Sequence, residues 1–131
     1  MKLNYQWPLP SQPRPIEIIG SGGIVKDAHL PAYQKAEFKV LGVYDINPEQ
    51  SAKIANSWNL KTFGSLDSLI SSAQSQNAVF DLALPPSAVS NVLEQLPEHA
   101  TVLIQKPMGN DLEEAKLIKA ICERKKLTAA V

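Results

Sequence analysis

A chain of 131 residues fits one domain, which would bury about two-thirds of the surface that its unfolded form exposes. Thirteen basic and thirteen acidic residues cancel, so the sequence lacks the positive charge of a nucleic-acid-binding domain. No segment is long and apolar enough to cross a bilayer, and residues 1–7 lack the apolar stretch of a signal peptide. The single Cys122 fits a reducing compartment. We therefore expect a cytoplasmic protein without nucleic-acid or membrane partners.

Residues 1–14 contain three prolines together with Trp7. Proline lacks the amide hydrogen that a helix needs, so this segment is expected to form an extended arm. Two interpretations stay open: Trp7 packs on its own domain, or the arm reaches a partner subunit. The globular domain is expected to span residues 15–131.

Six short apolar segments predict β-strands, separated by segments with the apolar spacing of helices. The strands are expected at residues 16–19, 39–44, 61–63, 77–84, 101–104 and 127–131. Strands that alternate with helices predict an α/β fold: a doubly wound parallel six-stranded sheet with helices on both faces, which is the Rossmann fold. The expected strand order is 3-2-1-4-5-6.

Capping residues and prolines mark where the helices begin and end. Pro31 is expected either to break the helix that follows the first strand or to start a second turn at residues 32–35. Asn47 with Gln50 predicts the start of the second helix, and Asn110 with Glu113 that of the last helix. The apolar side of this last helix is expected to comprise Leu112, Ala115, Ile118, Ile121 and Cys122.

A cluster of glycines follows the first strand. Gly20 allows a tight turn, and Gly22 would let a pyrophosphate approach the backbone at the start of a helix. The amide groups and the dipole of a helix N-terminus favour such an anion. Val25 departs from the glycine-rich pattern at its third position, which suggests wider packing or a shifted helix start. A purely structural turn is the alternative.

Asp45 stands at the end of the second strand, roughly 20 residues after the glycines. A carboxylate at this place binds the ribose hydroxyls of a dinucleotide, and its charge repels the extra phosphate of NADP. Glycines and acid together therefore predict a dinucleotide site that prefers NAD over NADP. No residue pattern indicates a metal site, and His29 is expected to have a packing or capping role.

The carboxyl ends of parallel strands meet at one edge of the sheet, where ligands bind. The fourth strand ends in Leu84-Pro85, and Gln105-Lys106-Pro107 follows the fifth strand. Lys106 is the side chain at this edge that could donate a proton or hold a developing alkoxide, so it is the candidate catalytic residue. A surface lysine at a strand exit is the alternative.

With these motifs, residues 15–131 resemble the cofactor domain of the Gfo/Idh/MocA family, which includes glucose-fructose oxidoreductase and inositol dehydrogenase. The resemblance implies an NAD(P)-dependent oxidoreductase that acts on sugars, cyclitols or related hydroxylated substrates, with Lys106 contacting the substrate hydroxyl. Gln105 stands where the family has a glutamate. Family members also have a second domain, which supplies the catalytic histidine, most of the substrate pocket and the subunit interface, and which this chain lacks.

We therefore expect the NAD(P)-binding domain of a CH-OH dehydrogenase, inactive by itself and homo-oligomeric in its full-length form. The expected cofactor-binding residues are Gly20, Ser21, Gly22, Gly23, Ile24, Asp45, Leu84, Pro85, Gln105 and Lys106. The alternative function is that of a non-enzymatic nucleotide-binding module or cofactor sensor.

Overall fold

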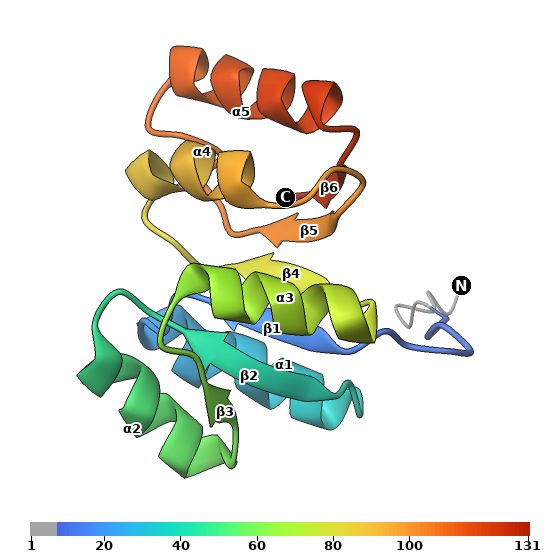
Figure 1. Ribbon diagram of the computed structural model, residues 1–131, viewed down its shortest axis with the longest axis vertical. Coiled ribbons are helices and arrows are strands. Elements are labelled where there is room, and N and C mark those ends of the chain that lie inside the picture. The colour runs from blue at the N-terminus through green and yellow to red at the C-terminus, as the bar shows by residue number, and fades with distance from the viewer. Residues whose placement is uncertain (1–7) are drawn as a thin grey trace, which may run out of the picture.

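The computed structural model describes residues 8–131, and this part of the chain forms a six-stranded parallel sheet (Figure 1). The strand order is β3-β2-β1-β4-β5-β6. The strands are β1 (Ile16–Ile19), β2 (Val40–Tyr44), β3 (Lys61–Thr62), β4 (Val79–Leu82), β5 (Thr101–Ile104) and β6 (Thr128–Ala130). The predicted fold class and strand order are thus confirmed. The expected roles of Trp7 concern a residue outside the described part.

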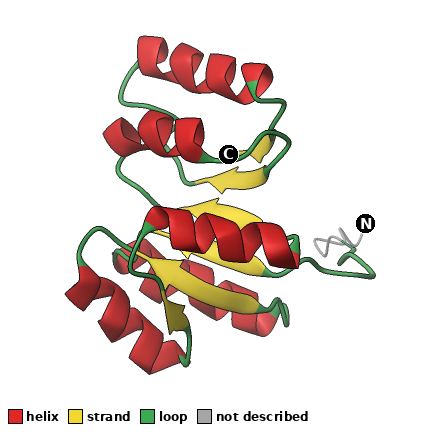
Figure 2. Ribbon diagram, viewed as in Figure 1, coloured by secondary structure: helices red, strands yellow, loops and turns green. Residues whose placement is uncertain are grey.

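Helices connect the strands and cover both faces of the sheet (Figure 2). They are η1 (Val25–His29), α1 (Leu30–Lys35), α2 (Pro48–Trp58), α3 (Leu66–Gln76), α4 (Pro86–Gln95) and α5 (Leu112–Arg124). In Figure 1, α3 lies in front of the sheet and α1 behind it. Among the described residues, none of the helices has the length and apolar character needed to span a membrane.

The sheet separates two apolar cores. The larger core joins β4 and β5 to α3, α4 and α5, and it contains the fully buried Leu69, Leu82 and Leu93. Full burial of one leucine side chain contributes about 2 kcal/mol. The smaller core joins β1 and β2 to η1, α1 and α2, and it includes Ile18 and Val25. Alternate residues of each central strand therefore point into different cores.

Of the two expected effects of Pro31, the structure shows the second: the chain stays helical, and Pro31 lies at the start of a further helical segment. η1 is a π-helical turn that α1 continues, and the Leu30 amide donates to the Val25 carbonyl five residues back. Pro31 then falls in the first turn of α1. No amide hydrogen is needed at that position, so the chain stays helical through the proline.

The start of α2 is capped differently from the expected pattern. The Asn47 side chain accepts a hydrogen bond from the Glu49 amide at 3.1 Å, as an N-cap residue should. Gln50 does not return to the Asn47 amide, which donates to Asp45 instead. The Gln50 side chain donates to the Ser21 carbonyl at 3.4 Å, and so connects α2 to the glycine turn.

The cap of α5 is Asp111, and the predicted cap at Asn110 was wrong by one residue. Asp111 accepts from the Glu114 amide at 2.9 Å, whereas Asn110 donates to the Glu114 carboxylate. Leu112 is 68% exposed and does not join the buried side, which is formed around Ile118 and Ile121. The shift of the cap places Leu112 at the first helical position, outside the core.

β4 is shorter than the predicted strand at residues 77–84. Asn77 ends α3 in the left-handed conformation with φ of 51°, which short polar side chains tolerate. Pro85 precedes the first residue of α4, so the strand also ends early. Asp81 lies within β4 and is fully buried, although the pattern of this segment indicated an apolar strand.

Candidate functional site

The glycine turn after β1 is fixed by close backbone packing. Gly20 has φ of 97°, and a Cβ atom added there would lie 2.3 Å from the carbonyl oxygen of Ala83. A side chain is therefore excluded at Gly20 on two independent grounds. A Cβ atom at Gly22 would have no neighbour within 4 Å, so this residue faces open space. The turn is rigid on its inner side and accessible on its outer side.

The helix begins directly at this turn. The Val25 amide donates to the Gly22 carbonyl at 3.1 Å, and the Lys26 amide approaches the same oxygen at 3.4 Å. The preceding amides belong to the first helical turn, which has no internal acceptors for them. Val25 itself is fully buried against β1 and β2, where the usual third glycine would stand. A π-helical turn begins at Val25, directly after the glycine turn.

Asp45 connects the glycine turn to the end of β2. Its Oδ2 atom accepts hydrogen bonds from the Ser21 amide at 2.8 Å and the Ser21 hydroxyl at 2.7 Å. Its Oδ1 atom accepts from the Asn47 amide at 2.9 Å. Three donors thus hold the carboxylate in one orientation beside the open face of the turn. Sequence spacing predicted Asp45 at this edge, but it did not predict the pairing with Ser21.

A cavity of about 230 Å³ lies between η1 and α2, next to the turn. Its lining residues are Ser21, Gly22, Gly23, Lys26, Gln50, Lys53, Ile54 and Ser57. Lys26 and Lys53 give the lining a positive charge, and no acid belongs to it. Together with the helix N-terminus, these lysines make this end of the sheet favourable for an anion such as a pyrophosphate.

The ends of β4 and β5 lie at the same edge of the sheet. Leu84 packs against the turn, because its Cδ2 atom would lie 3.3 Å from a Cβ atom at Gly20. The Gln105 amide donates to the Leu82 carbonyl, and the Gln105 side chain accepts from the Lys106 amide at 3.0 Å. Lys106 is exposed, and its peptide bond to Pro107 is cis. Asp45 and Leu84 therefore contact the glycine turn in this structure. Lys106 lies at the same edge of the sheet, and within residues 8–131 its side chain makes no hydrogen bond to the turn.

Asp81 of β4 forms a buried polar cluster with the helix that begins at the glycine turn. Its Oδ2 atom accepts from His29 Nδ1 at 2.7 Å and from the Tyr33 hydroxyl at 2.8 Å. The hydrogen bond to Asp81 raises the pKa of His29, and burial opposes this effect. Burial and the charge of Asp81 raise the pKa of Tyr33, so its hydroxyl stays a donor. His29 has the expected packing position. The role of Asp81 was not predicted from the sequence, where its only signal is that it is a charged residue within an apolar strand.

Glu17 of β1 is a second fully buried acid and points to the opposite face of the sheet. Its Oε1 atom accepts from the Ser72 hydroxyl of α3 at 2.8 Å. Burial raises the pKa of Glu17, although the Ser72 hydrogen bond and the charge of Lys61 lower it. Gly42 leaves room for this carboxyl group, because a Cβ atom there would lie 3.2 Å from Glu17 Oε2.

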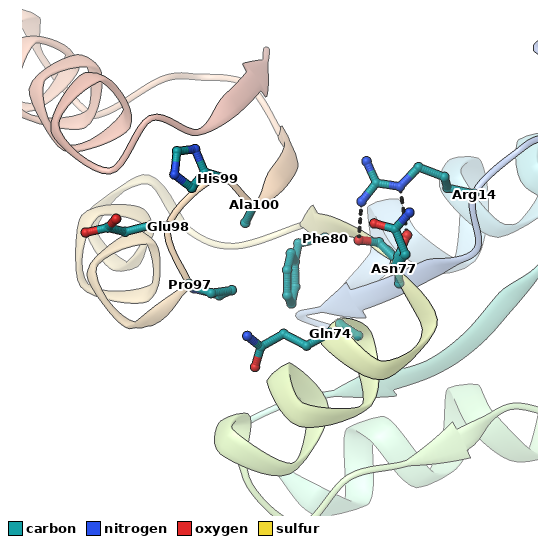
Figure 3. Close-up of a pocket in the computed structure, with 10 residues that line it drawn as sticks. Arg14, Gln74, Asn77, Phe80, Pro97, Glu98, His99 and Ala100 are labelled. Atoms are coloured by element: carbon teal, nitrogen blue, oxygen red, sulfur yellow. Dashed lines mark hydrogen bonds between the residues drawn. The ribbon is translucent and has the colours of Figure 1, made fainter.

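Another pocket of about 230 Å³ lies at the amino edge of the sheet (Figure 3). Arg14 donates to the carbonyls of Asn77 and Ala78 at its border, and Glu98 and His99 line the other side. These interactions use the guanidinium group to connect the chain before β1 to the start of β4. The described residues contain no group of three or more side chains suited to a metal ion.

Known proteins resemble this chain in sequence. The sequence model of the oxidoreductase family with an NAD-binding Rossmann fold matches residues 15–131. Glucose-6-phosphate 3-dehydrogenase of Bacillus subtilis is 32% identical over 119 residues, which cover 88% of this chain and 32% of that protein. UDP-N-acetylglucosamine 3-dehydrogenase of Acidithiobacillus ferrooxidans is 28% identical over 116 residues, which cover 83% of this chain and 35% of that protein.

Solved structures show the same fold. The WlbA dehydrogenase of Bordetella pertussis, in complex with NADH and UDP-GlcNAcA, superimposes with a TM-score of 0.72 and 22% identity. The match covers 88% of this chain and 36% of that structure. The present chain thus spans about a third of the length of the curated relatives it matches. It is an NAD-binding domain and belongs to the oxidoreductase family with the NAD-binding Rossmann fold.

Proposed function

We propose that this domain binds NAD(P) for a dehydrogenase that moves a hydride between the cofactor and a sugar, cyclitol or similar hydroxylated substrate. The observation that carries the proposal is the glycine turn at a helix N-terminus, held to the β2 end by the Asp45 hydrogen bonds to Ser21. The open space at Gly22 fits the close approach of a pyrophosphate to the backbone. When bound, the nicotinamide supplies a hydride acceptor or donor.

Each residue at the carboxyl edge has a role in this proposal. Gly22, Gly23 and Ile24 present backbone amides to the pyrophosphate. Asp45 holds the ribose hydroxyls with the capacity that Oδ1 retains after accepting from Asn47. The remaining cofactor contacts of the site come from Leu84, Pro85 and Gln105, which follow the neighbouring strands β4 and β5.

Lys106 is proposed as the catalytic residue that holds the reacting hydroxyl and exchanges its proton. Its support is its place after β5, at the edge of the sheet where ligands of such folds bind. Gln105 keeps a hydrogen-bonding side chain without charge and orients the Lys106 amide. Two of the relatives are named as dehydrogenases of a phosphorylated sugar and of a nucleotide-linked sugar, which supports a sugar-like substrate.

The domain organisation remains a proposal: an arm at residues 1–14, the cofactor domain at residues 15–131, and a substrate domain that is not part of this chain. Relatives about three times as long support the last point. A cytoplasmic location and a homo-oligomeric full-length enzyme are proposed as well. Membership in an oxidoreductase family supports this function over that of a sensor module.

Calorimetric titration of the 131-residue chain with NADH and then NADPH tests the proposal. We expect NADH to bind about tenfold more tightly, which corresponds to about 1.4 kcal/mol, because the Asp45 carboxylate repels the additional phosphate. Asp45→Asn should reduce this preference, whereas Glu98→Gln, an exposed acid at the opposite edge, should leave it unchanged. Failure of the parent chain to bind either dinucleotide would overturn the function, and an unaltered preference in Asp45→Asn would remove Asp45 from its role.

A further inference from the structure

The Asp81 cluster joins the centre of the sheet to a single helix. Asp81 is paired with Ile18 of β1 on one side and Leu103 of β5 on the other. Its carboxylate is fully buried, and one oxygen accepts both hydrogen bonds that reach it among the described residues. His29 and Tyr33, which donate these bonds, lie one helical turn apart. The cluster therefore attaches the helix at two successive points.

The same helix carries the phosphate-facing end of the proposed dinucleotide site. It starts at Gly22, whose carbonyl accepts from the Val25 and Lys26 amides. His29 is the last residue of the π-helical turn, and Pro31 follows two residues later. A π-helical turn followed by proline departs from the regular backbone ladder of a helix, and the two side-chain bonds to Asp81 add to the apolar packing of Val25 in fixing this helix on the sheet.

The charges around the cluster indicate how the attachment works. A buried carboxylate requires a positive partner or neutralisation, and His29 is the cationic candidate within hydrogen-bonding distance in residues 8–131. The neighbouring Ile18 and Leu103 carry no charge, and Tyr33 donates as a neutral hydroxyl. Lys26 and Asp27 of η1 are exposed. The His29 side chain is 13% exposed, so it can still exchange protons with solvent.

We propose that Asp81 and protonated His29 are positioning residues that hold the phosphate-binding helix on the sheet, so that proton uptake by His29 strengthens dinucleotide binding. We call the hydrogen-bonded pair of Asp81 and His29 the clamp. The proposal rests on the proposed function, because that function supplies the dinucleotide whose binding the clamp would affect. The clamp does not touch the cofactor; it acts through the helix whose first amides face the pyrophosphate. Loss of the proton leaves a neutral imidazole that donates a weaker hydrogen bond to Asp81.

Nuclear magnetic resonance of the imidazole nitrogens tests the clamp without any ligand. The chain contains two histidines, and a His99→Asn variant assigns their signals. We expect His29 to titrate above its ordinary value of about 6.5 in the parent chain, and close to or below that value in Asp81→Asn. Because Asp81→Asn could prevent folding, Tyr33→Phe provides a second variant, which removes one of the two donors to Asp81 and in which His29 can still be titrated. Equal His29 titration in the parent chain and Asp81→Asn would overturn the ion pair.

Calorimetric titration with ADP-ribose, which has the pyrophosphate but no nicotinamide, tests the coupling to binding. The affinity of the parent chain should fall about tenfold between about pH 6 and about pH 9, within the usual range of coupling between sites. In His29→Gln, which keeps a donor without a titrating charge, the affinity should not change over this range. His99→Asn should retain the parent pH profile. A parent affinity that stays constant while His29 titrates would overturn the proposal.

Hydrogen exchange separates failure of the clamp from failure of the function. If the clamp holds the turn, the Val25 and Lys26 amides, which donate to the Gly22 carbonyl, should exchange at least about tenfold faster in His29→Gln than in the parent chain. Should the parent chain bind no ADP-ribose while this difference persists, the proposed function fails and the positioning of the helix stands. Unchanged exchange in these amides would overturn the positioning role itself.

Discussion

Asp81 and Glu17 are two buried acids on neighbouring strands, and the cost of burying their carboxyl groups is offset in different ways. Asp81 faces η1 and α1 and receives bonds from a histidine and a tyrosine. Glu17 faces α3, receives one bond from Ser72, and has a pKa raised by burial. The first acid therefore has a partner that can carry positive charge, whereas the second has a neutral hydroxyl as its hydrogen-bond partner. Only the first is connected to the helix of the glycine turn.

Replacing Asp81 by alanine should have the largest effect on stability. It leaves the His29 nitrogen and the Tyr33 hydroxyl without their acceptor, and we expect a loss of about 3 kcal/mol in the free energy of unfolding. Urea denaturation at neutral pH measures this loss, with Glu98→Ala as the exposed control. A loss below about 1 kcal/mol would mean that the cluster contributes little to folding.

Closing the space beside Glu17 should have the next largest effect. In Gly42→Ala the new Cβ atom would lie 2.6 Å from Phe63 Cε2 and 2.7 Å from the Lys61 carbonyl. We expect about 2 kcal/mol of destabilisation, because the strand backbone cannot move away without disturbing its pairing. Gly64→Ala is the matched control, since a Cβ atom there meets nothing within 4 Å. Equal midpoints of thermal unfolding in the two variants would contradict this interpretation.

Removing the Tyr33 hydroxyl should have a smaller effect. Tyr33→Phe keeps the ring and deletes one of the two bonds to Asp81, and we expect a loss of about 1 kcal/mol. The His29 bond should persist, so the loss should be well below that of Asp81→Ala. Chemical denaturation of both variants provides the comparison, and equal losses would show that the two donors do not share the carboxylate as described.

Glu17→Gln should have the smallest effect at acidic pH, below about 1 kcal/mol, because the glutamine replaces a carboxyl group that burial keeps protonated. A raised pKa in the folded state stabilises the protein below the unfolded-state value and loses this contribution as the pH rises through the folded-state value. The free energy of unfolding of the parent chain should thus decline from about pH 4.5 upward, and this decline should be absent in Glu17→Gln.

His29 also has a raised pKa, so the same sign applies in a higher range. Its contribution is complete below about pH 6.5 and is lost as the pH rises through the raised value. His29→Gln should remove the decline in this upper range and leave the lower one intact. The free energy of unfolding should be measured across both pH ranges. The comparison would be contradicted if Glu17→Gln changed the decline in the upper range or His29→Gln changed the decline in the lower range.

Residue pattern predicted the sheet, its strand order and the location of the glycine turn and Asp45, because these depend on local apolar runs and on glycine. It failed where a long-range contact decides the local structure. Gln50 fits a capping pattern, yet it bonds to Ser21 across the site. Pro31 allowed either a break or a second helical turn, and the pattern alone did not decide between them. The partners of Asp81 lie about 50 residues away in the chain, beyond any local pattern.

The most direct test of the account is a two-dimensional amide spectrum of the labelled chain during titration with NADH. We expect the largest shifts of amide signals at residues 21–24, with further shifts at Asp45 and Leu84, because these residues surround the open face of the turn. Shifts confined to Asn77, Ala78 and His99 would place the ligand in the pocket at the amino edge (Figure 3) and would contradict the proposed site.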